Sequence, residues 1–182
     1  WIDGTFGRGG HASALLERGA WVLGLDQDDE AEAAARAVEA RWPETFRWRQ
    51  HNFKDLKTCS IEHGWNEVDG VLLDLGVSSP QLETPERGFS FRSEGALGMR
   101  MDRRSGPTAA DLVNELSAEE LTQLFYEHGG EREARRVVRA LVARRQRAPF
   151  RTTTDLASVV AETLAHRRAR GIHPATQVFQ AL

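Results

Sequence analysis

The stretch that decides the fold of this 182-residue chain is Ile2-Asp3-Gly4-Thr5-Phe6-Gly7-Arg8-Gly9-Gly10-His11 (IDGTFGRGGH). It reads as a strand end, then four glycines within seven residues, then a helical stretch over Ala12–Arg18. The backbone of such a loop can pass close to a ligand, and the N-terminus of the helix points toward the loop. Taken alone, the same composition is also compatible with a flexible turn.

The spacing of these glycines bears on the kind of ligand. It does not fit G-x-G-x-x-G, the pattern of dinucleotide-binding loops. Asp3 stands directly before the glycines. A carboxylate there would repel a pyrophosphate, but it suits a cationic ligand that carries an amino acid. The loop therefore favours S-adenosylmethionine over a dinucleotide.

Working outward, residues 20–75 alternate short apolar runs with helical stretches. Strands are predicted over Ala20–Asp26, Phe46–Gln50 and Val68–Leu75, and helices over Asp28–Trp42 and Phe53–His63. The last strand, VDGVLLDL, reads as buried on both faces. This rhythm predicts a parallel, doubly wound α/β sheet, in which ligands bind outside the carboxyl ends of the strands.

Three further candidate residues stand at those carboxyl ends. Asp26 closes its strand and can accept hydrogen bonds from ribose hydroxyls, or else cap the helix that starts near Asp28. Phe53 can stack on adenine or anchor the core. Asp74 precedes a turn of small residues over Gly76–Gln81, which is a plausible floor for a reaction site.

The composition excludes several classes of protein. With 40% apolar and 28% charged residues the chain is not disordered, and no stretch approaches the roughly 20 apolar residues of a membrane span. The single cysteine, Cys59, excludes a disulfide framework and predicts a reducing compartment. The six histidines are scattered without ligand spacing, so no metal site is expected.

The net charge of −3 hides an uneven distribution. Residues 1–91 carry 9 basic and 16 acidic side chains, and residues 92–131 carry 4 and 8. Residues 132–182 carry 11 basic side chains, all of them arginine, and 3 acidic ones. Arginine neutralises phosphates, so this block predicts an RNA-facing region. A solvated helix surface is the alternative.

Residues 108–170 are helical in pattern. A capping box over Ser117–Glu120 opens one helix, which Gly129 and Gly130 end. A second helix over Glu131–Gln146 has one apolar face, and a third is capped within Thr152–Asp155. Four arginines lie largely off the apolar face of the second helix: Arg132, Arg135, Arg136 and Arg139.

Several segments together resemble the bacterial ribosomal RNA small-subunit methyltransferase H family, which methylates the N4 amine of a cytidine in the decoding centre of 16S rRNA. The matching segments are Asp3–His11 (DGTFGRGGH), Val68–Gln81 (VDGVLLDLGVSSPQ), Glu86–Arg92 (ERGFSFR), Met99–Asp102 (MRMD) and His173–Leu182 (HPATQVFQAL). They run nearly the whole length of the chain. The resemblance implies a Rossmann-like S-adenosylmethionine-dependent methyltransferase sheet with an inserted all-helical domain.

The resemblance also implies residue roles. The expected cofactor contacts are Gly9, Gly10, His11, Asp26, Phe53, Asp74 and Gln81. We expect Asp74, Ser78 and Ser79 to accept the hydrogens of the substrate amine, although Asp74 could serve the cofactor alone. The expected RNA contacts are Arg100, Arg135, Arg136, Arg139 and His173. His173 could instead cap a helix, and Arg100 could pair with Asp102.

The expected domains are residues 1–100 (the N-terminal part of the methyltransferase domain), 101–172 (the helical insertion) and 173–182 (the return to the first domain). Only about four of the seven strands of such a sheet are identifiable, so the sheet is expected to be incomplete within this chain. The expected partner is small-subunit rRNA or the 30S particle in the cytoplasm, without a membrane. A homodimer is left open.

Three positions depart from the family pattern: Gly98, Gly130, where an acidic residue is usual, and Gln177, where a basic one is frequent. Two rival classes of protein are also left open. One is an NAD-dependent oxidoreductase on the same sheet, which the glycine spacing and Asp3 disfavour. The other is an RNA-binding fragment without catalytic activity.

Overall fold

The computed structural model describes residues 1–182 except for the side chains of residues 168–170. The chain folds into two compact units. The first comprises residues 1–76 and 101–105, and the second comprises residues 77–100 and 106–182. The expected domains divide elsewhere, at residues 100 and 172, and the assignment of separate roles to them stays a prediction.

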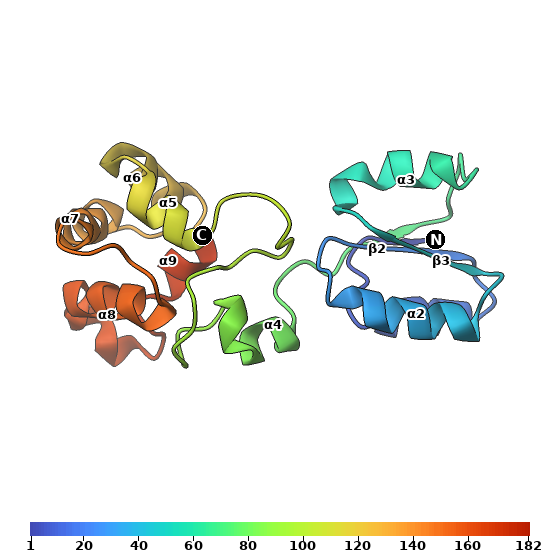
Figure 1. Cartoon of the computed structure of the whole chain (residues 1–182), viewed down its shortest axis with the longest axis horizontal. Coiled ribbons are helices and arrows are strands. Elements are labelled where there is room, and N and C mark those ends of the chain that lie inside the picture. Colours follow the sequence, from blue (N-terminus) through green and yellow to red (C-terminus); the bar gives the residue numbers. More distant parts are fainter. The chain divides into compact units, whose positions relative to one another are not determined.

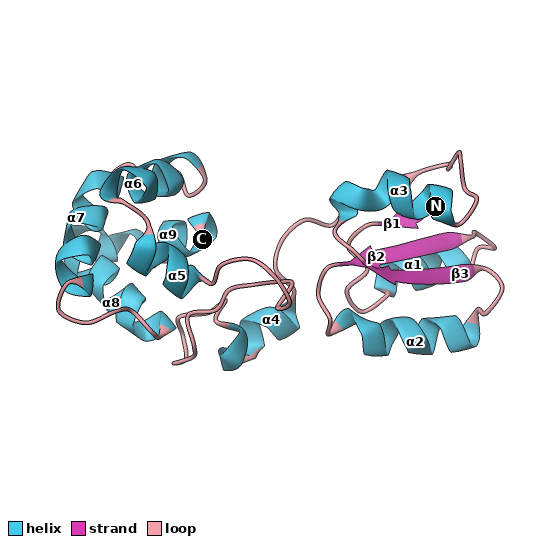
Figure 2. Ribbon diagram, turned by 45° about the horizontal axis from the view of Figure 1, so that its top comes forward, coloured by secondary structure: helices cyan, strands magenta, loops and turns pink.

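The first unit is built around a parallel four-stranded sheet in the order β3-β2-β1-β4 (Figures 1 and 2). Its strands are β1 (Ile2–Asp3), β2 (Val22–Asp26), β3 (Phe46–Gln50) and β4 (Val71–Leu72). Its helices are α1 (Gly10–Leu16), α2 (Ala31–Arg41), the short 3-10 helix η1 (Phe53–Asp55) and α3 (Leu56–Glu62). The parallel doubly wound sheet that the sequence predicts is confirmed.

The two faces of the sheet are covered by different helices. Val22 packs in a cluster with residues of α1 and α2, whereas Leu23 and Leu25 pack with Cys59 of α3. Successive side chains of a strand point to opposite faces, and β2 is apolar on both, so it lies inside the unit. Figure 1 shows α2 and α3 on opposite sides of the sheet.

The prediction of a long strand buried on both faces over Val68–Leu75 is wrong. β4 has only two residues, and Val71, Leu73 and Leu75 are 43%, 42% and 68% exposed. The reason is the position of β4 at the edge of the described sheet, where it pairs with β1 alone. An apolar run predicts a buried strand only where a neighbouring strand lies on each side of it.

The second unit is helical. Its elements are α4 (Ser79–Glu83), η2 (Pro85–Arg87), α5 (Ala109–Glu115), α6 (Ala118–Glu127), α7 (Ala134–Arg145), α8 (Thr153–Thr163), η3 (Ala165–Arg170) and α9 (Thr176–Ala181). One core cluster joins α5 to α9, with Phe125, Val137, Leu141 and Leu156 fully buried. The capping box at Ser117 is confirmed, since Ser117 Oγ accepts from the Glu120 N–H and the Glu120 carboxylate accepts from the Ser117 N–H.

None of the helices that the structure describes is long and apolar enough to cross a membrane.

Candidate functional site

The glycine-rich loop after β1 is held by hydrogen bonds to the carboxyl ends of two neighbouring strands. The Gly4 N–H donates to the Leu72 carbonyl of β4 (2.9 Å), and the Phe6 N–H donates to the Leu25 carbonyl of β2 (2.9 Å). The Asp74 N–H in turn donates to Thr5 Oγ1 (2.7 Å). The loop is therefore held in a defined conformation at the carboxyl edge of the sheet, which argues against the flexible-turn alternative.

Close packing and a positive φ favour glycine in this loop. Gly9 has φ +77°, and a Cβ there would lie 2.7 Å from the ring of Phe6, which is itself buried against Phe46 and Trp48. A Cβ at Gly4 would lie 2.5 Å from the end of the Leu73 side chain, which is exposed enough to move aside. Gly9 is therefore the position at which a larger residue would disturb the loop most.

Asp3 lies beneath the loop and is fully buried. Its Oδ1 accepts from the Thr5 N–H at 3.3 Å, whereas its Oδ2 has no hydrogen-bond partner among the described residues. Burial raises the pKa of Asp3, and the backbone N–H groups of Thr5 and Ala12 and the nearby His11 oppose that shift. Oδ2 nevertheless makes no hydrogen bond of good geometry within the described residues, which is costly for a buried acceptor.

Asp26 at the end of β2 serves the loop rather than a helix. Its Oδ2 accepts from the Gly7 N–H (2.8 Å) and its Oδ1 from the Asp28 N–H (2.9 Å). Burial raises the pKa of Asp26 despite these two hydrogen bonds. The N-cap of α2 is Glu30, so the alternative that Asp26 caps this helix is wrong.

Two more expected cofactor residues lie beside the loop. The Nε2 atom of His11, in the first turn of α1, is 3.5 Å from the Asp74 carboxylate, and both side chains are largely exposed. Phe53 begins η1 and is half-buried, with its Cβ 3.0 Å from where a Cβ of Gly4 would stand. The first unit thus brings together six of the seven expected cofactor residues: Gly9, Gly10, His11, Asp26, Phe53 and Asp74.

The seventh, Gln81, belongs to the second unit together with Ser78 and Ser79. Ser78 caps α4, its Oγ accepts from the Gln81 N–H, and the Gln81 Oε1 accepts from the Ser78 N–H (2.8 Å). Gln81 is buried, whereas Ser78 and Ser79 are exposed. Local helix capping accounts for the Ser78–Gln81 spacing, and the expected roles of these residues toward a cofactor or substrate stay predictions.

Residues 101–105 return to the first unit and contact the segment that follows Asp26. Gln27 Nε2 donates to Met101 Sδ (3.2 Å), and Gln27 Oε1 accepts from Asn52 Nδ2 (2.7 Å). The Arg103 guanidinium forms a bidentate pair with Asp29, at 3.1 and 2.6 Å. Nothing in the MRMD motif alone indicates this return, because the partner residues lie 74 positions earlier in the chain.

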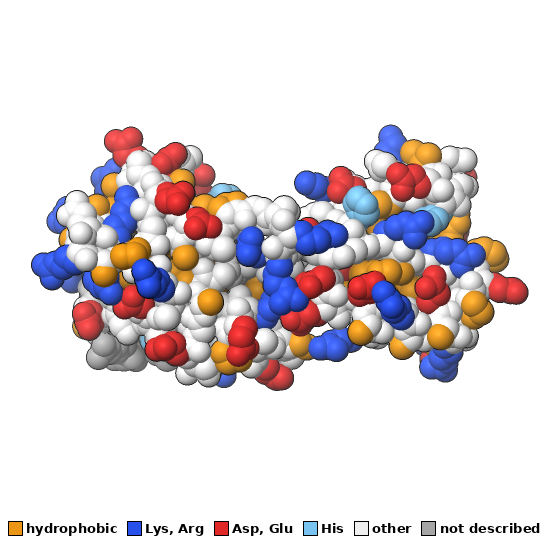
Figure 3. Space-filling model, in the orientation of Figure 1, with side chains coloured by type: hydrophobic (Ala, Val, Ile, Leu, Met, Phe, Trp, Pro, Cys, Tyr) orange, Lys and Arg blue, Asp and Glu red, His pale blue; other side chains and the backbone are white. Residues whose placement is uncertain are grey.

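The expected RNA-binding arginines of α7 differ in their surroundings. Arg135 and Arg139 are exposed and make no ion pair or hydrogen bond with any side chain that the structure describes. Arg136 donates to Glu133 Oε2 at 3.1 Å. Figure 3 shows blue Lys and Arg side chains over α7 and red acidic side chains over α5 and α6. The solvated-face alternative thus fits Arg136 best, since its guanidinium is exposed and already paired within its own helix end.

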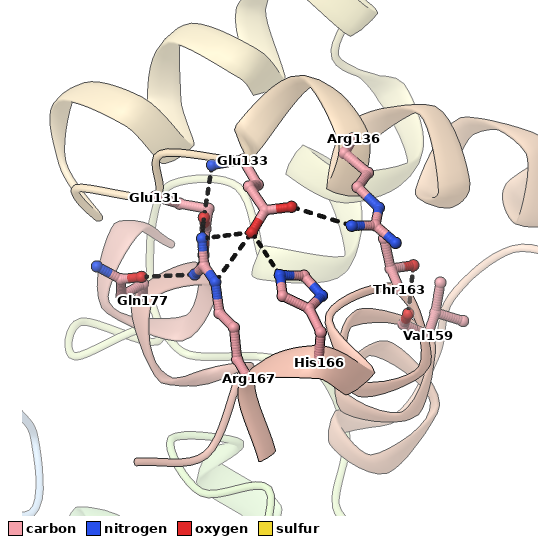
Figure 4. Close-up of polar contacts among 8 residues, drawn as sticks. All are labelled: Glu131, Glu133, Arg136, Val159, Thr163, His166, Arg167 and Gln177. Atoms are coloured by element: carbon pink, nitrogen blue, oxygen red, sulfur yellow. Dashed lines mark hydrogen bonds and ion pairs between the residues drawn. The ribbon is translucent and has the colours of Figure 1, made fainter. Parts of the chain in front are cut away.

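A network of ion pairs lies at the start of α7 (Figure 4). Glu131 is fully buried, and Arg167 donates to both of its carboxylate oxygens at 2.9 Å. Arg167 also donates to Glu133 Oε1, which His166 contacts at 3.0 Å. Burial raises the pKa of Glu133, but the hydrogen bonds from Arg136 and His166 and the charge of Arg167 outweigh it, so the net shift is downward.

Arg100 and His173 both have local partners. Arg100 donates to the Gly106 carbonyl, and Asp102 forms a bidentate pair with Arg104. The Nδ1 of His173 accepts from the Ala175 N–H (3.2 Å), and its ring lies against Phe91, with the centroids 4.5 Å apart. The N-cap of α9 (Thr176–Ala181) is Ala175, so the alternative that His173 caps this helix is wrong, and its contact with RNA stays a prediction.

Sequence reasoning missed Thr5 and Gly7 as loop-ordering residues, and it did not place Asp3 among the contact residues. The signal for all three was their position at the end of β1 or directly after it, since each bonds to a neighbouring strand end or its own loop. Within the described part of the chain, no group of three His, Cys, Asp or Glu residues could hold a metal ion.

The parallel sheet, its helices on both faces and the glycine loop at its carboxyl edge are those of a Rossmann-like methyltransferase fold. The MraW methylase family matches residues 1–182, and the chain belongs to that family.

Three curated relatives carry the name ribosomal RNA small subunit methyltransferase H. Those of Thermomicrobium roseum, Trichlorobacter lovleyi and Cyanothece sp. are 49%, 47% and 47% identical over 185, 186 and 184 residues. Each match covers 100% of this chain, and 56%, 59% and 60% of the relative. The chain thus spans a little over half the length of these relatives.

Proposed function

We propose that this chain is part of an S-adenosylmethionine-dependent methyltransferase that methylates the N4 amine of a cytidine in the decoding centre of small-subunit rRNA. Membership of a methylase family and the names of the relatives support the reaction class and the RNA. The observation that carries the proposal is the glycine loop bonded to β2 and β4, with Asp3 buried beneath it.

The loop fits the proposed cofactor in two respects. Asp3 Oδ2 is a buried acceptor without a partner among the described residues, which suits a ligand that brings an amino group. The space beside Gly10 is open, with no atom within 4 Å of where a Cβ would stand, so a ligand can approach the backbone there. In this proposal Gly9, Gly10 and His11 line the amino-acid end. Asp26 receives the ribose, and the remaining contacts come from Phe53, Asp74 and Gln81.

The chemical demand falls on the methyl acceptor. S-adenosylmethionine, when bound, supplies an electrophilic methyl group whose leaving thioether is neutral. The N4 lone pair of cytosine is delocalised into the ring, so the amine is a poor nucleophile. The site must orient the amine and accept its hydrogens, which makes the nitrogen more like that of a free amine.

We assign this acceptor role to Asp74, Ser78 and Ser79. The Asp74 carboxylate is largely exposed beside the loop, and its backbone is held by Thr5, so its oxygens are available to a substrate. The cytidine has to be unpaired or flipped out to reach such a site. The arginines of α7 would hold the surrounding phosphates. The proposed setting is the 30S particle in the cytoplasm.

Two measurements test the proposal. Calorimetric titration with S-adenosylmethionine and with NAD separates the methyltransferase from the oxidoreductase, and tighter binding of NAD would refute it. The full-length protein is then incubated with small ribosomal subunits and labelled S-adenosylmethionine, and the modified base is identified by mass spectrometry. We expect N4-methylcytidine, and methyl incorporation at any other atom would refute the substrate assignment.

The role of Asp74 is tested with Asp74→Asn, and Glu67→Gln serves as a control at an exposed carboxylate of the same unit. Cofactor affinity and single-turnover methyl transfer are measured separately. We expect the transfer rate to fall about 100-fold, the scale of a positioned acid–base group, and the affinity to fall by less, since Asp74 is one of several proposed cofactor contacts. Lost binding with a normal transfer rate would show that Asp74 serves only the cofactor.

A further inference from the structure

A groove of about 890 Å³ runs between α6 and α7 in the second unit. Its floor is apolar, formed by Ala134 and Val138, which are buried, and by the half-buried Val142. Tyr126 of α6 lines the groove and is 63% exposed, although most of its ring is apolar. An exposed aromatic ring beside an apolar floor is costly to leave in contact with water. A flat ligand can cover the ring by stacking on it, so this surface suits a flat ligand.

The two walls of the groove carry opposite charges. Arg132, Arg135 and Arg139 line the side of α7, and Glu119 and Glu127 line the side of α6. None of the three arginines is paired with a side chain that the structure describes, even though carboxylates stand across the groove. Glu127 instead accepts from Gln123 (3.1 Å). The guanidinium groups are therefore available to an anionic ligand.

We propose that this groove binds a single-stranded segment of RNA, with the backbone along α7 and a base stacked on Tyr126. The inference rests on the proposed function, which makes RNA the substrate, and it adds a contact surface whose residues are none of those assigned to methyl transfer. Arg135 and Arg139 are one helical turn apart, about 6 Å along α7, so they contact the backbone on the same side.

The charge pattern sets the orientation of the strand. The carboxylates of α6 repel phosphates and keep the backbone on the arginine wall. They can also accept hydrogen bonds from exocyclic base amines, as acidic side chains do from cytosine N4. Stacking on an exposed aromatic ring requires an unpaired base, so a duplex should not bind in this way. The groove thus selects single-stranded RNA.

Tyr126 is the only tyrosine of the chain, which makes it a unique probe. Protein labelled with fluorotyrosine gives one fluorine NMR signal, which is followed during titration with a single-stranded oligoribonucleotide and with a duplex of the same composition. We expect the single strand to shift the signal by ring current and the duplex to leave it in place. An unmoved signal at saturating single strand would overturn the proposal.

Affinities of the variants separate the two contacts. Tyr126→Ala should weaken binding of the single strand at least about fivefold, at the low end of measured base-stacking losses, and Tyr126→Phe should restore it. Arg135→Ala with Arg139→Ala should reduce the slope of log affinity against log salt by about 1.4, since each phosphate contact on a single strand contributes about 0.7. Arg147→Ala is the control, an exposed arginine outside the groove.

The outcomes also distinguish this inference from the proposed function. The groove is refuted if Tyr126→Ala binds the single strand as tightly as the unmodified protein does. It is also refuted if the Arg135→Ala, Arg139→Ala double variant leaves the salt slope unchanged. Either result refutes the groove alone if S-adenosylmethionine still binds and small subunits are still methylated. Failure to bind S-adenosylmethionine would refute the proposed function, whatever the fluorine signal does.

Discussion

Replacing Arg167 by methionine tests whether the buried network of Figure 4 stabilises the second unit. Methionine keeps most of the apolar stem and removes the guanidinium. Four hydrogen bonds are lost: two to Glu131 at 2.9 Å, one to Glu133 at 3.0 Å and one to Gln177 at 3.3 Å. Glu131 stays fully buried and keeps only the N–H of Glu133, which donates to Oε1 at 2.7 Å.

The magnitude follows from this burial. Removing one partner of a buried ion pair costs about 3–5 kcal/mol, because a charge is left without compensation. The side chain of Arg167 is 18% exposed, so water can partly replace it, and we expect the low end, about 3 kcal/mol. The second unit comprises residues 77–100 and 106–182, and for a unit of that size its melting midpoint should fall by about 12–24 °C.

The assay is urea unfolding followed by two signals. All five tryptophans lie in the first unit, so their fluorescence reports that unit, whereas most of the helical circular dichroism comes from the second. We expect Arg167→Met to shift the circular dichroism transition and to leave the fluorescence transition in place. Arg147→Met, at an exposed arginine, should change the free energy of unfolding by less than about 0.5 kcal/mol.

A second variant shows whether the loss comes from the uncompensated charge. Glu131→Gln combined with Arg167→Met removes both charges, and it should recover much of the lost stability, as replacement of whole buried pairs often does. If Arg167→Met costs no more than the Arg147 control, or if the double variant is less stable than Arg167→Met, the reasoning is refuted.

Three other variants probe the two units. Gly129→Ala should destabilise the second unit by about 2–3 kcal/mol, because its Cβ would collide with a backbone carbonyl of α9, and Gly98→Ala, with ordinary contacts, should be nearly neutral by the same unfolding assay. Burial raises the pKa of Asp3, so its contribution to stability is present at acid pH and is lost as the pH rises through the folded-state pKa. Asp3→Asn should therefore remove this pH dependence and raise the stability of the first unit at pH 7, which tryptophan fluorescence measures. The same variant should weaken S-adenosylmethionine binding, which calorimetry measures. Gly9→Ala should cost about 1–3 kcal/mol from positive φ and the contact with an aromatic ring, whereas Gly10→Ala, in open space, should cost less than about 1 kcal/mol; equal losses would contradict the steric argument.

Local signals in the sequence predicted the elements that depend on local physics. β3 has the predicted bounds Phe46–Gln50, because alternation and the preceding Pro43 define it without help from distant residues. The capping boxes at Ser117 and the cap at Thr152 are also local, since donor and acceptor lie three residues apart. Six of the expected cofactor residues lie in one unit because strand ends of a parallel sheet share one edge.

Features that depend on distant contacts could not be read in this way. The apolar run before Asp74 predicted a buried strand. The exposure of that strand depends on which strands lie beside it, and the residues of the run do not indicate which strands those are. Gln81 is expected to contact a cofactor, and the structure adds a local role, since its buried side chain closes the capping box of Ser78. The Ser-x-x-Gln spacing was a visible signal for that local role.

Two of the departures from the family pattern contact each other. Gln177 Nε2 donates to the Gly130 carbonyl (3.1 Å), and Gln177 Oε1 accepts from Arg167. An acidic residue at position 130 would be strained, because Gly130 has φ +63°. The Gln177 side-chain amide therefore bonds to two groups of the second unit, the Gly130 carbonyl and the Arg167 guanidinium. The departure at position 177 thus has a structural role within that unit.

The pairing of Arg103 with Asp29 has a consequence for the order in which the protein is made. The two residues close a loop of 74 positions, and most of that loop belongs to the first unit, but residues 77–100 belong to the second. A ribosome synthesises the chain from its N-terminus, so the sheet, the glycine loop and Asp26 emerge well before Met101 and Arg103. The edge beside Gln27 therefore stays uncovered during translation until part of another unit has been completed, and chaperones or nascent-chain probes would meet that edge only in this interval.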